Sequence, residues 1–439
     1  MSSDGRSNEP RRVAKAVVQI GSLARSVLAA ARRRLRRTFL LVVALTLAYT
    51  QCLSSPPWDS PDPIPAPTSL ARSVTVDPGV WAMPRGDAGS TGVTMAQPPL
   101  DAPVAWVRDL PQSPIVFIAD HDSVYLAIGE TSELLALATA TGKERWTVET
   151  PGRPDHAPAL AGDALYVQVR GRGLMTLDAR TGRERWVDRS GALTTTPTVA
   201  AGMLWGGQRG QVVVLDAETG AKLAQVGIDG QFVKQPIAIG PDRVVVAKPD
   251  TLLFLDRTTG ERTFEARFPD LQFIVAEGDI VVALSDRQIV GFDSLAGLPW
   301  WDGTRDWWFR LRVYVGLPGV PSPPNRWVQQ VHCEALAPVL HHDLVILACE
   351  EGNVRAFALS TGEQLWTQQL ERLVAGPVLT ASGLLLATEQ GLALLDPGTG
   401  EEFGRRELSE WPIHDMIVTS DAIYLLTIRH QLVALRGAD

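Results

Sequence analysis

One pattern returns along the chain about every 40 residues: a strand-like apolar run, then Leu-Asp-x-x-Thr-Gly, then a charged pair and often Trp. The glycines that end successive copies are 40, 38, 40, 37, 65 and 38 residues apart, so the period is about 38 to 40 with one insertion. They are Gly142, Gly182, Gly220, Gly260, Gly297, Gly362 and Gly400. A repeat of this length predicts one body that grows by adding units, although 439 residues would otherwise suggest about three domains.

Each copy of the pattern predicts a tight turn between two strands. The Asp carboxylate or the Thr hydroxyl can accept hydrogen bonds from nearby backbone N–H groups, and Gly accepts a positive φ. The run before such a turn, as in residues 212–215, and the run after one, as at Trp186, therefore form a hairpin. Two further short runs precede each hairpin, for example residues 114–118 and 124–128. Four strands in about 40 residues make one propeller blade, and blades must stack because a lone sheet cannot cover both of its faces.

The two ends of the repeat region complement one another. Residues 431–436 resemble the third strand of a blade, and the chain stops before the turn and outer strand that would follow. Residues 102–106 resemble an outer strand without its predecessors, because Trp106 lies 40 residues before Trp146. Pairing of these ends would complete an eighth blade and remove the free sheet edge. The sequence thus predicts an all-β, eight-bladed propeller of four-stranded antiparallel blades, closed by its terminal strands.

The full unit, Leu-Asp-x-x-Thr-Gly-Lys/Arg-Glu-x-Trp, resembles the tryptophan-docking repeat of the pyrroloquinoline-quinone (PQQ) propellers over roughly residues 101–439. At the docking position of this repeat, Phe264 stands as a substitute for the tryptophan, whereas Ala224 and Gly404 depart from the aromatic pattern. The residues that match the turn and docking positions are Thr141, Gly142, Trp146, Asp178, Thr181, Gly182, Trp186, Asp216, Gly220, Asp256, Gly260, Gly362, Trp366, Asp396 and Gly400. The aspartates, Asp293 included, recur once per blade, as a structural role requires and a catalytic role does not.

The resemblance spans two kinds of protein. It includes quinoprotein alcohol dehydrogenases, which bind PQQ and Ca²⁺ in a central funnel and usually carry a disulfide of adjacent cysteines. It also includes non-catalytic members, such as the propeller lipoprotein of the outer-membrane β-barrel assembly machinery. This sequence has no adjacent cysteine pair and no Cys-x-x-Cys-His haem motif. We therefore expect no catalytic residues, no PQQ or other cofactor, no metal, and a role like that of the non-catalytic branch.

The amino terminus predicts export. A cluster of arginines at residues 32–37 precedes a mostly apolar run at residues 39–48, which is too short to cross about 30 Å of hydrocarbon but has the length of a signal-peptide core. Cys52 follows as in a lipoprotein signal, although Gln51 stands where a small residue is usual. Lipidation of Cys52, ordinary cleavage and an uncleaved anchor all stay open, and Arg36-Arg37 also matches a twin-arginine signal. We assign residues 1–52 to this signal and residues 53–100, rich in Pro, Ser and Gly, to a disordered tether without a core.

The charge distribution excludes nucleic acid as a partner. Residues 1–51 carry a net charge of about +8, which leaves about −16 on the remainder from 31 basic and 47 acidic residues. Binding to nucleic acid needs clustered Lys and Arg against the phosphates, which so acidic a body does not offer.

The insertion at about residues 298–326 is the irregular feature of the repeat region. Its tryptophans are candidates for a partner-binding surface, because Trp dominates the energetics of protein interfaces. The alternative is a loop folded over the rim, and either Trp301 or Trp327 could hold the docking position. The candidates for partner binding are Trp300, Trp301, Trp307 and Trp308.

Two smaller features leave alternatives open. His341-His342 could suggest a metal, but we favour a solvated turn because the sequence offers no spaced acidic or Cys ligands nearby. Cys333 and Cys349 are expected on different strands, as a disulfide in an oxidising compartment or as two buried thiols.

These inferences combine into one hypothesis. We expect a monomeric, exported and membrane-tethered periplasmic propeller that serves as a non-enzymatic scaffold of the bacterial cell envelope, with outer-membrane protein assembly as its implied role. Its partners would be envelope proteins, such as components of the barrel assembly machinery. A PQQ-dependent dehydrogenase and a sensor that binds a small ligand or polysaccharide are the alternatives.

Overall fold

The computed structural model describes residues 80–293 and 325–437, apart from residues 98–99, 113, 115–116, 229–232, 234–236 and 261. Every regular element in these ranges is a β-strand. Among the same residues, none belongs to a helix of the length and apolarity that a membrane crossing needs.

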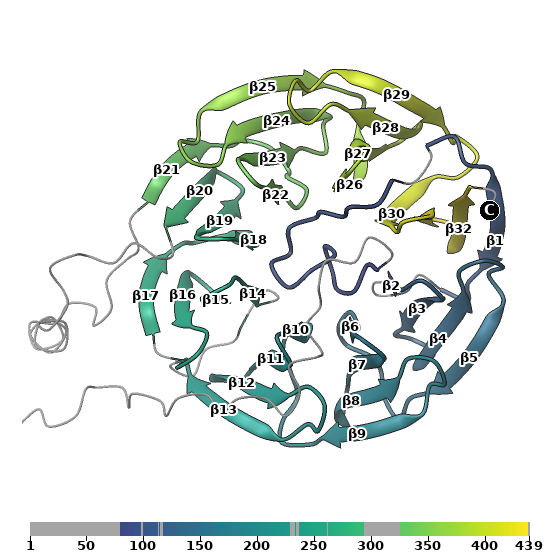
Figure 1. Cartoon of the computed structure of the whole chain (residues 1–439), viewed down its shortest axis with the longest axis vertical. Coiled ribbons are helices and arrows are strands. Elements are labelled where there is room, and N and C mark those ends of the chain that lie inside the picture. Colours follow the sequence, from purple (N-terminus) through teal and green to yellow (C-terminus); the bar gives the residue numbers. More distant parts are fainter. Residues whose placement is uncertain are drawn as a thin grey trace, which may run out of the picture. The chain divides into compact units, whose positions relative to one another are not determined.

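The strands form eight four-stranded antiparallel sheets arranged as the blades of a propeller (Figure 1). The expected eight-bladed fold is thereby confirmed. From the innermost to the outermost strand, the blades are β2 (Phe117–Ala119), β3 (Ser123–Ile128), β4 (Glu133–Ala138) and β5 (Glu144–Glu149); β6 (Ala159–Ala161), β7 (Ala164–Val169), β8 (Gly173–Asp178) and β9 (Glu184–Asp188); β10 (Thr198–Ala200), β11 (Met203–Gln208), β12 (Gln211–Asp216) and β13 (Lys222–Gly227); β14 (Ala238–Ile239), β15 (Arg243–Lys248), β16 (Thr251–Asp256) and β17 (Arg262–Arg267); β18 (Leu271–Glu277), β19 (Ile280–Ser285), β20 (Gln288–Asp293) and β21 (Asn325–Gln330); β22 (Val339–His341), β23 (Leu344–Ala348), β24 (Asn353–Ala358) and β25 (Gln364–Gln369); β26 (Leu373–Thr380), β27 (Gly383–Thr388), β28 (Gly391–Leu395) and β29 (Glu402–Glu407); and β30 (Ile413–Val418), β31 (Ala422–Thr427), β32 (Gln431–Arg436) and β1 (Val104–Asp109).

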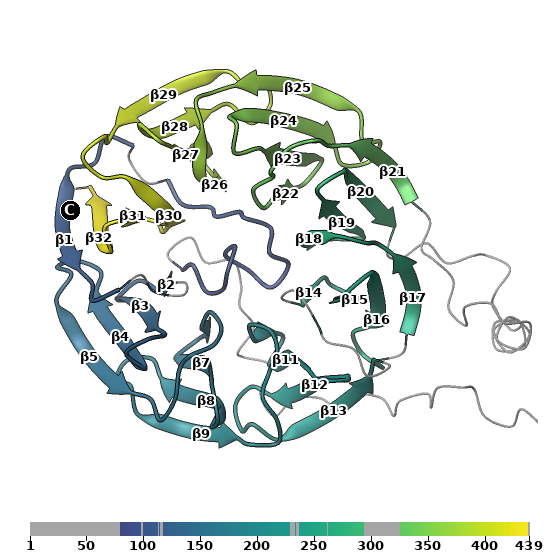
Figure 2. The ribbon, with the colours of Figure 1, turned by 180° about the vertical axis from the view of Figure 1, so that it is seen from behind.

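The last blade closes the ring with strands from both ends of the repeat region. β1 pairs antiparallel with β32, so that Trp106 lies opposite Ala434 and Val107 opposite Val433. Figure 2 shows β1 beside β32 from the other face of the ring. The predicted closure by terminal strands is confirmed.

Burial along each blade explains its apolar pattern. The second strand is buried on both faces, as in all six residues of β3, whereas the outer strand β5 buries Trp146 and exposes its neighbours. The core lies between adjacent sheets: Tyr125 and Ala136 of one blade pack in a cluster with Leu165 and Val167 of the next. Because both faces of a blade are covered by neighbours, the inner strands read as continuous apolar runs.

Residues 80–97, which we call the axial segment, run through the middle of the ring (Figures 1 and 2). Trp81, Ala82 and Met83 are each at most 3% exposed. The predicted disordered tether over residues 53–100 is therefore wrong for this part. Its residues bury apolar side chains and hydrogen-bond to the blades, although they lack the periodicity of a strand or helix. Residues 53–79 lie outside the described residues.

Candidate functional site

The repeat turns take the geometry that their chemistry suggests. In the β8–β9 turn, Asp178 Oδ1 accepts hydrogen bonds from the Thr181 backbone N–H (3.0 Å) and hydroxyl (2.9 Å). The Gly182 N–H donates to the Asp178 carbonyl at 2.8 Å, with φ +69° at Gly182. Asp216, Asp256 and Asp396 make the same side-chain contacts in their own turns, to Thr219, Thr259 and Thr399. The first of these turns has Ala138 in place of Asp and keeps Thr141 and Gly142.

Each docking tryptophan lies against the turn glycine of the next blade. The Trp146 indole N–H donates to the Ala179 carbonyl at 2.9 Å, and a Cβ added at Gly182 would lie 2.9 Å from the Trp146 ring. The same contact joins Trp106 to Gly142, Trp186 to Gly220, Trp327 to Gly362 and Trp366 to Gly400. Trp327 thus holds the docking position after the insertion.

Where the docking tryptophan is missing, other side chains occupy the space. Phe264 is buried and packs edge-on against Phe254. At Gly404 the side chain of Leu100 approaches to 3.0 Å of where a Cβ would stand, so a residue from the beginning of the chain occupies space that the glycine leaves.

The axial segment binds the innermost strands in ring order. At one equivalent position in seven of the eight blades, an inner-strand N–H donates to an acceptor in residues 81–92. The donor and acceptor pairs are Ala119 to Trp81 O, Leu160 to Ala82 O, Val199 to Met83 Sδ, Ile239 to Ala88 O, Ala276 to Gly89 O, Leu340 to Thr91 O and Leu379 to Gly92 O. Since an inner strand is a sheet edge, these contacts satisfy backbone donors that would otherwise face the axis unpaired.

A charged group lies within this segment. The Arg85 guanidinium donates to the carbonyls of Pro377 (2.9 Å) and Pro338 (3.1 Å), which belong to two blades. Burial lowers the pKa of Arg85 to about 10, against the opposing effect of Asp415 and Asp87, so the group stays protonated at neutral pH. Burial raises the pKa of both carboxyl groups. The axis therefore holds a cation bonded to backbone oxygens, with two carboxyl groups nearby.

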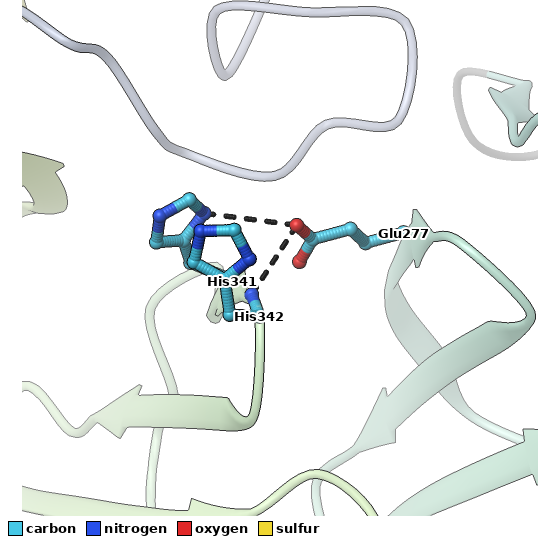
Figure 3. A group of neighbouring side chains, drawn as sticks. All are labelled: Glu277, His341 and His342. Carbon is cyan, nitrogen blue, oxygen red and sulfur yellow. Dashed lines mark hydrogen bonds and ion pairs between the residues drawn. The ribbon is translucent and has the colours of Figure 1, made fainter.

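A second polar cluster bridges two adjacent blades beneath the axial segment (Figure 3). Glu277 ends β18, and His341 ends β22 at the equivalent position of the next blade. His341 Nδ1 lies 3.6 Å from Glu277 Oε1, and the His342 backbone N–H donates to the same oxygen at 3.2 Å. The two imidazole rings are 3.9 Å apart between centroids.

Burial governs the protonation of this cluster. Burial, followed by the charge of His342, lowers the pKa of His341, so its contact with Glu277 is not an ion pair at neutral pH. Burial also raises the pKa of Glu277, and the Asp87 carboxylate adds to that effect. The prediction of a solvated turn accounts for only part of what the structure shows. His342 is exposed at the turn, but Glu277, which lies 64 positions before His341 in the sequence, faces both histidines.

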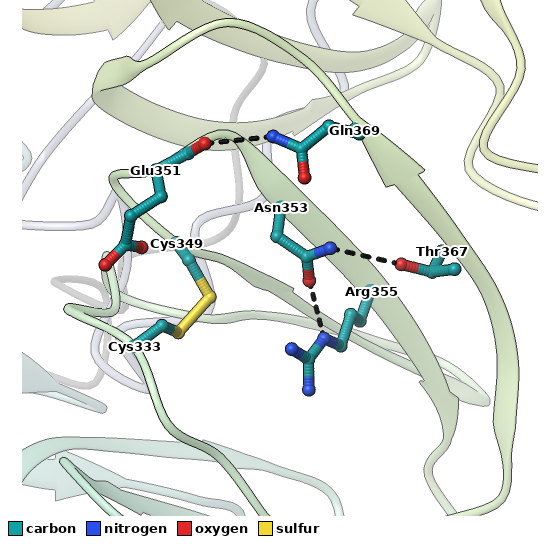
Figure 4. Close-up of a disulfide and its surroundings, with 7 residues drawn as sticks. All are labelled: Cys333, Cys349, Glu351, Asn353, Arg355, Thr367 and Gln369. Carbon is teal, nitrogen blue, oxygen red and sulfur yellow. Dashed lines mark hydrogen bonds between the residues drawn. A yellow bond between two sulfur atoms is a disulfide. The ribbon is translucent and has the colours of Figure 1, made fainter.

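Cys333 and Cys349 form a disulfide with a Cα–Cα distance of 5.8 Å (Figure 4). Cys349 directly follows β23, and Cys333 lies in the connection between β21 and β22, not on a strand as expected. The bond ties that connection to the blade it enters.

Cys52, Trp300, Trp301, Trp307 and Trp308 lie outside the described residues. Sequence reasoning missed the axial segment and the Glu277 partner of the histidines. The one signal for the segment was the apolar Trp81-Ala-Met83 within a polar stretch, and the signal for Glu277 was its place one repeat before His341.

A family model described as outer membrane protein assembly factor BamB matches residues 92–239, 208–349 and 350–439. The outer membrane protein assembly factor BamB of Nitrosomonas eutropha is 26% identical over 268 residues, which cover 58% of this chain and 61% of that protein. The protein of the same name from Burkholderia pseudomallei is 27% identical over 195 residues, covering 42% and 45%. The chain thus matches less than two thirds of the length of either relative.

Solved structures share the fold. BamB from Moraxella catarrhalis matches with a TM-score of 0.55 and 18% identity, over 76% of this chain and 96% of that one. The computationally designed Ika8 protein matches with a TM-score of 0.59 and 13% identity, over 75% and 98%. A europium-containing methanol dehydrogenase matches with a TM-score of 0.56 and 11% identity, over 80% and 89%. Because an assembly factor, a designed protein and an enzyme all share this architecture, the fold alone does not decide the function.

Proposed function

The chain belongs to the family described as outer membrane protein assembly factor BamB, whose model matches it from residue 92 to residue 439, and from this premise we propose that it is a protein-interaction scaffold in outer-membrane protein assembly. The family match is the observation that carries the proposal. The expected kinship with the assembly branch of the PQQ-like propellers is confirmed at the level of the family.

The architecture supports a binding role. Stacked blades hold the loops at both ring faces on a rigid frame, where their sequence can vary without loss of the core. The axial segment adds seven contacts between the ring and the chain that precedes it, so the orientation of residues 80–97 is fixed relative to the blades. A scaffold needs such a fixed frame, because binding then costs little ordering entropy.

A non-enzymatic role is part of the proposal. In the resembling dehydrogenases the quinone occupies a central funnel, whereas here residues 81–92 lie in the middle of the ring and hydrogen-bond to the inner strands beside the hairpins. The chain also has no adjacent cysteine pair. Stoichiometric quinone in protein purified from the periplasm, together with dye-linked alcohol oxidation, would replace this proposal with the dehydrogenase alternative.

We place the protein at the periplasmic side of a membrane, exported by its amino-terminal signal and tethered through Cys52. Detergent-phase partitioning of the wild type and Cys52→Ser tests the tether. We expect the wild type in the detergent phase and the variant in the aqueous phase. Equal partitioning of both would contradict lipidation at Cys52.

Affinity capture from envelope fractions tests the scaffold role. The full chain, crosslinked in cells and purified under denaturing conditions, is expected to retain components of the barrel assembly machinery above an unrelated periplasmic bait. A Trp307→Ala/Trp308→Ala variant asks whether the insertion is the contact surface, and we expect it to lose the partner while its unfolding midpoint stays unchanged. Recovery of no assembly component with the wild type would overturn the proposal.

A further inference from the structure

We propose that Glu277, His341 and His342 form a transition-metal site, of the type that binds Zn²⁺, between the β18–β21 and β22–β25 blades. One carboxylate and two imidazoles are a common ligand set for zinc with a fourth, water-filled position. The inference is independent of the proposed function.

The fold brings the ligands together by repeat symmetry. Glu277 and His341 close the innermost strands of consecutive blades, and each pairs across its hairpin in the same way, with Ile280 and Leu344. Equivalent positions of neighbouring blades face each other around the ring. The other blades have at this position Asp120, Ala161, Ala200, Gly240, Thr380 and Thr419. Among these eight described residues, Glu277 and His341 are therefore the one pair of carboxylate or imidazole side chains on adjacent blades.

The third ligand comes from the turn itself. His342 has φ +50°, in the left-handed region, and it stands where other blades have Gly162, Ala201 and Gly278 at φ between +50° and +58°. This conformation turns its imidazole to the same side as that of His341, whereas neighbouring residues in an extended strand point to opposite sides. Both rings then approach the Glu277 carboxylate (Figure 3).

The distances suit one ion after a small rearrangement. One ligand atom from each residue lies within 4.8 Å of the other two. A tetrahedral zinc ion with bonds of about 2.0–2.1 Å holds its ligand atoms about 3.3 Å apart, so side-chain rotation suffices. His341 Nδ1 and Glu277 Oε1, at 3.6 Å, are already near this separation.

The apo geometry leaves a polar atom without a partner. Glu277 Oε2 is buried and accepts no hydrogen bond, and Oε1 is the oxygen that accepts from His342. A buried carboxylate oxygen without a donor needs a water, a cation or a rearrangement to offset its lost hydration. A metal ion supplies that partner. The ion would also join the two blades directly beside the Gly89 and Thr91 carbonyls of the axial segment, which bond Ala276 and Leu340.

Zinc titration of the untagged full chain, stripped with a chelator, tests the site. We expect isothermal titration calorimetry to give one Zn²⁺ per chain, and Co²⁺ to give the visible absorption bands of tetrahedral coordination. His342→Gly should weaken Zn²⁺ binding by at least about tenfold, since loss of an outer-shell partner alone costs 10–100-fold. Glycine suits the backbone here, because Gly162 and Gly278 hold the same turn position. Glu277→Gln should show the same loss.

The matched control is His430→Gly, because His430 is also an exposed histidine at positive φ, +59°, in another turn. It should bind Zn²⁺ as the wild type does. Wild-type affinity in both His342→Gly and Glu277→Gln would overturn the site, as would the absence of any Zn²⁺ uptake by the wild type. The disulfide removes Cys333 and Cys349 as competing thiolates.

Discussion

The glycine that ends a repeat serves two purposes at once where a docking tryptophan lies against it. At Gly182 the backbone is left-handed, with φ +69°, and the missing side chain admits the Trp146 ring from the preceding blade. Gly162 has a similar φ of +58°, but a Cβ there would meet nothing within 4 Å. The two positions therefore separate the conformational role of glycine from its packing role.

We expect Gly182→Ala to destabilise the propeller more than Gly162→Ala. Gly162→Ala should cost about 1–2 kcal/mol, the penalty of a side chain in the left-handed region. Gly182→Ala should cost about 1–3 kcal/mol more, because the added methyl displaces a buried tryptophan. Urea unfolding of both variants measures the difference. Equal losses would show that the docking contact adds nothing beyond the turn conformation.

A single residue, Asp178, also makes the stability of the fold depend on pH. Arg185 Nη2 lies 2.5 Å from Asp178 Oδ2, and its hydrogen bond is the main cause that lowers the pKa of Asp178. A carboxyl group with a lowered folded-state pKa stabilises the fold above its unfolded pKa of about 3.9, and this contribution is lost as the pH falls through the lower folded-state value.

Asp178→Asn should therefore be less stable than the wild type at pH 7, and the two should converge as the pH falls from about 4 toward 2. Denaturant unfolding at several pH values measures this. Asp396→Asn is the control, because Asp396 holds the same turn but, among the described residues, has no guanidinium or ammonium within 4 Å. A constant difference across the range for Asp178→Asn would mean that the ion pair contributes nothing.

At the scale of the element, the strands could be predicted and the axial segment could not. The turn chemistry of residues such as Asp178 and Gly182 recurs along the chain, with Ala138 and Ala358 replacing Asp in two of the turns, so four strands per period follow from local sequence alone. The axial segment bonds through backbone carbonyls, as at Gly89 and Thr91, and any residue offers a carbonyl. Its contacts thus leave no periodic side-chain pattern.

The cluster of Glu277, His341 and His342 shows the same contrast between what the local sequence predicts and what only the fold brings together. His341 and His342 are visible as a pair in the sequence, but Glu277 is 64 residues away, and only ring stacking makes the two strand ends neighbours. Aligning the repeats on their hairpins would have placed Glu277 and His341 at the same position. The sequence could not predict which tryptophan takes the docking position after the insertion for a different reason. Trp301 and Trp327 fit the local sequence pattern equally well.

We expect Gly89→Ala to loosen the axial segment without unfolding the ring. Gly89 has no positive φ, but its Cβ would come 2.3 Å from the Ala276 carbonyl oxygen, so the backbone must shift. Amide hydrogen exchange at Ala276 and Leu340 should accelerate at least about tenfold, or about 1.4 kcal/mol of local opening. Gly240→Ala is the control, because its nearest contact is 3.4 Å. Unchanged exchange in Gly89→Ala would mean that the segment does not hold these amides.

At the scale of the whole molecule, one non-covalent seam decides whether the ring is closed. The outer strand of every other blade follows its own inner strands in the chain, but β1 joins β32 from the opposite end of the repeat region. Trp106 strengthens this seam, since its ring contacts Tyr424 of β31, while its indole N–H donates to the Thr139 carbonyl of the following blade at 2.9 Å. An open seam would expose the β32 edge, which can pair with another chain.

The seam makes a prediction that a matched pair of variants can test. Val107 and Arg108 pair with β32 as Thr147 and Val148 pair with β4, at equivalent places in an outer strand. Since alternate amides of an outer strand face its partner, two consecutive prolines remove at least one ladder hydrogen bond in either blade. In Thr147→Pro/Val148→Pro the chain still runs covalently into β5, so the ring stays closed and the protein should remain monomeric.

In Val107→Pro/Arg108→Pro the seam opens, and we expect a melting temperature several degrees below that of the control. Light scattering after size exclusion should then show association that grows with concentration, and monomers with equal melting temperatures in both variants would contradict closure by this seam.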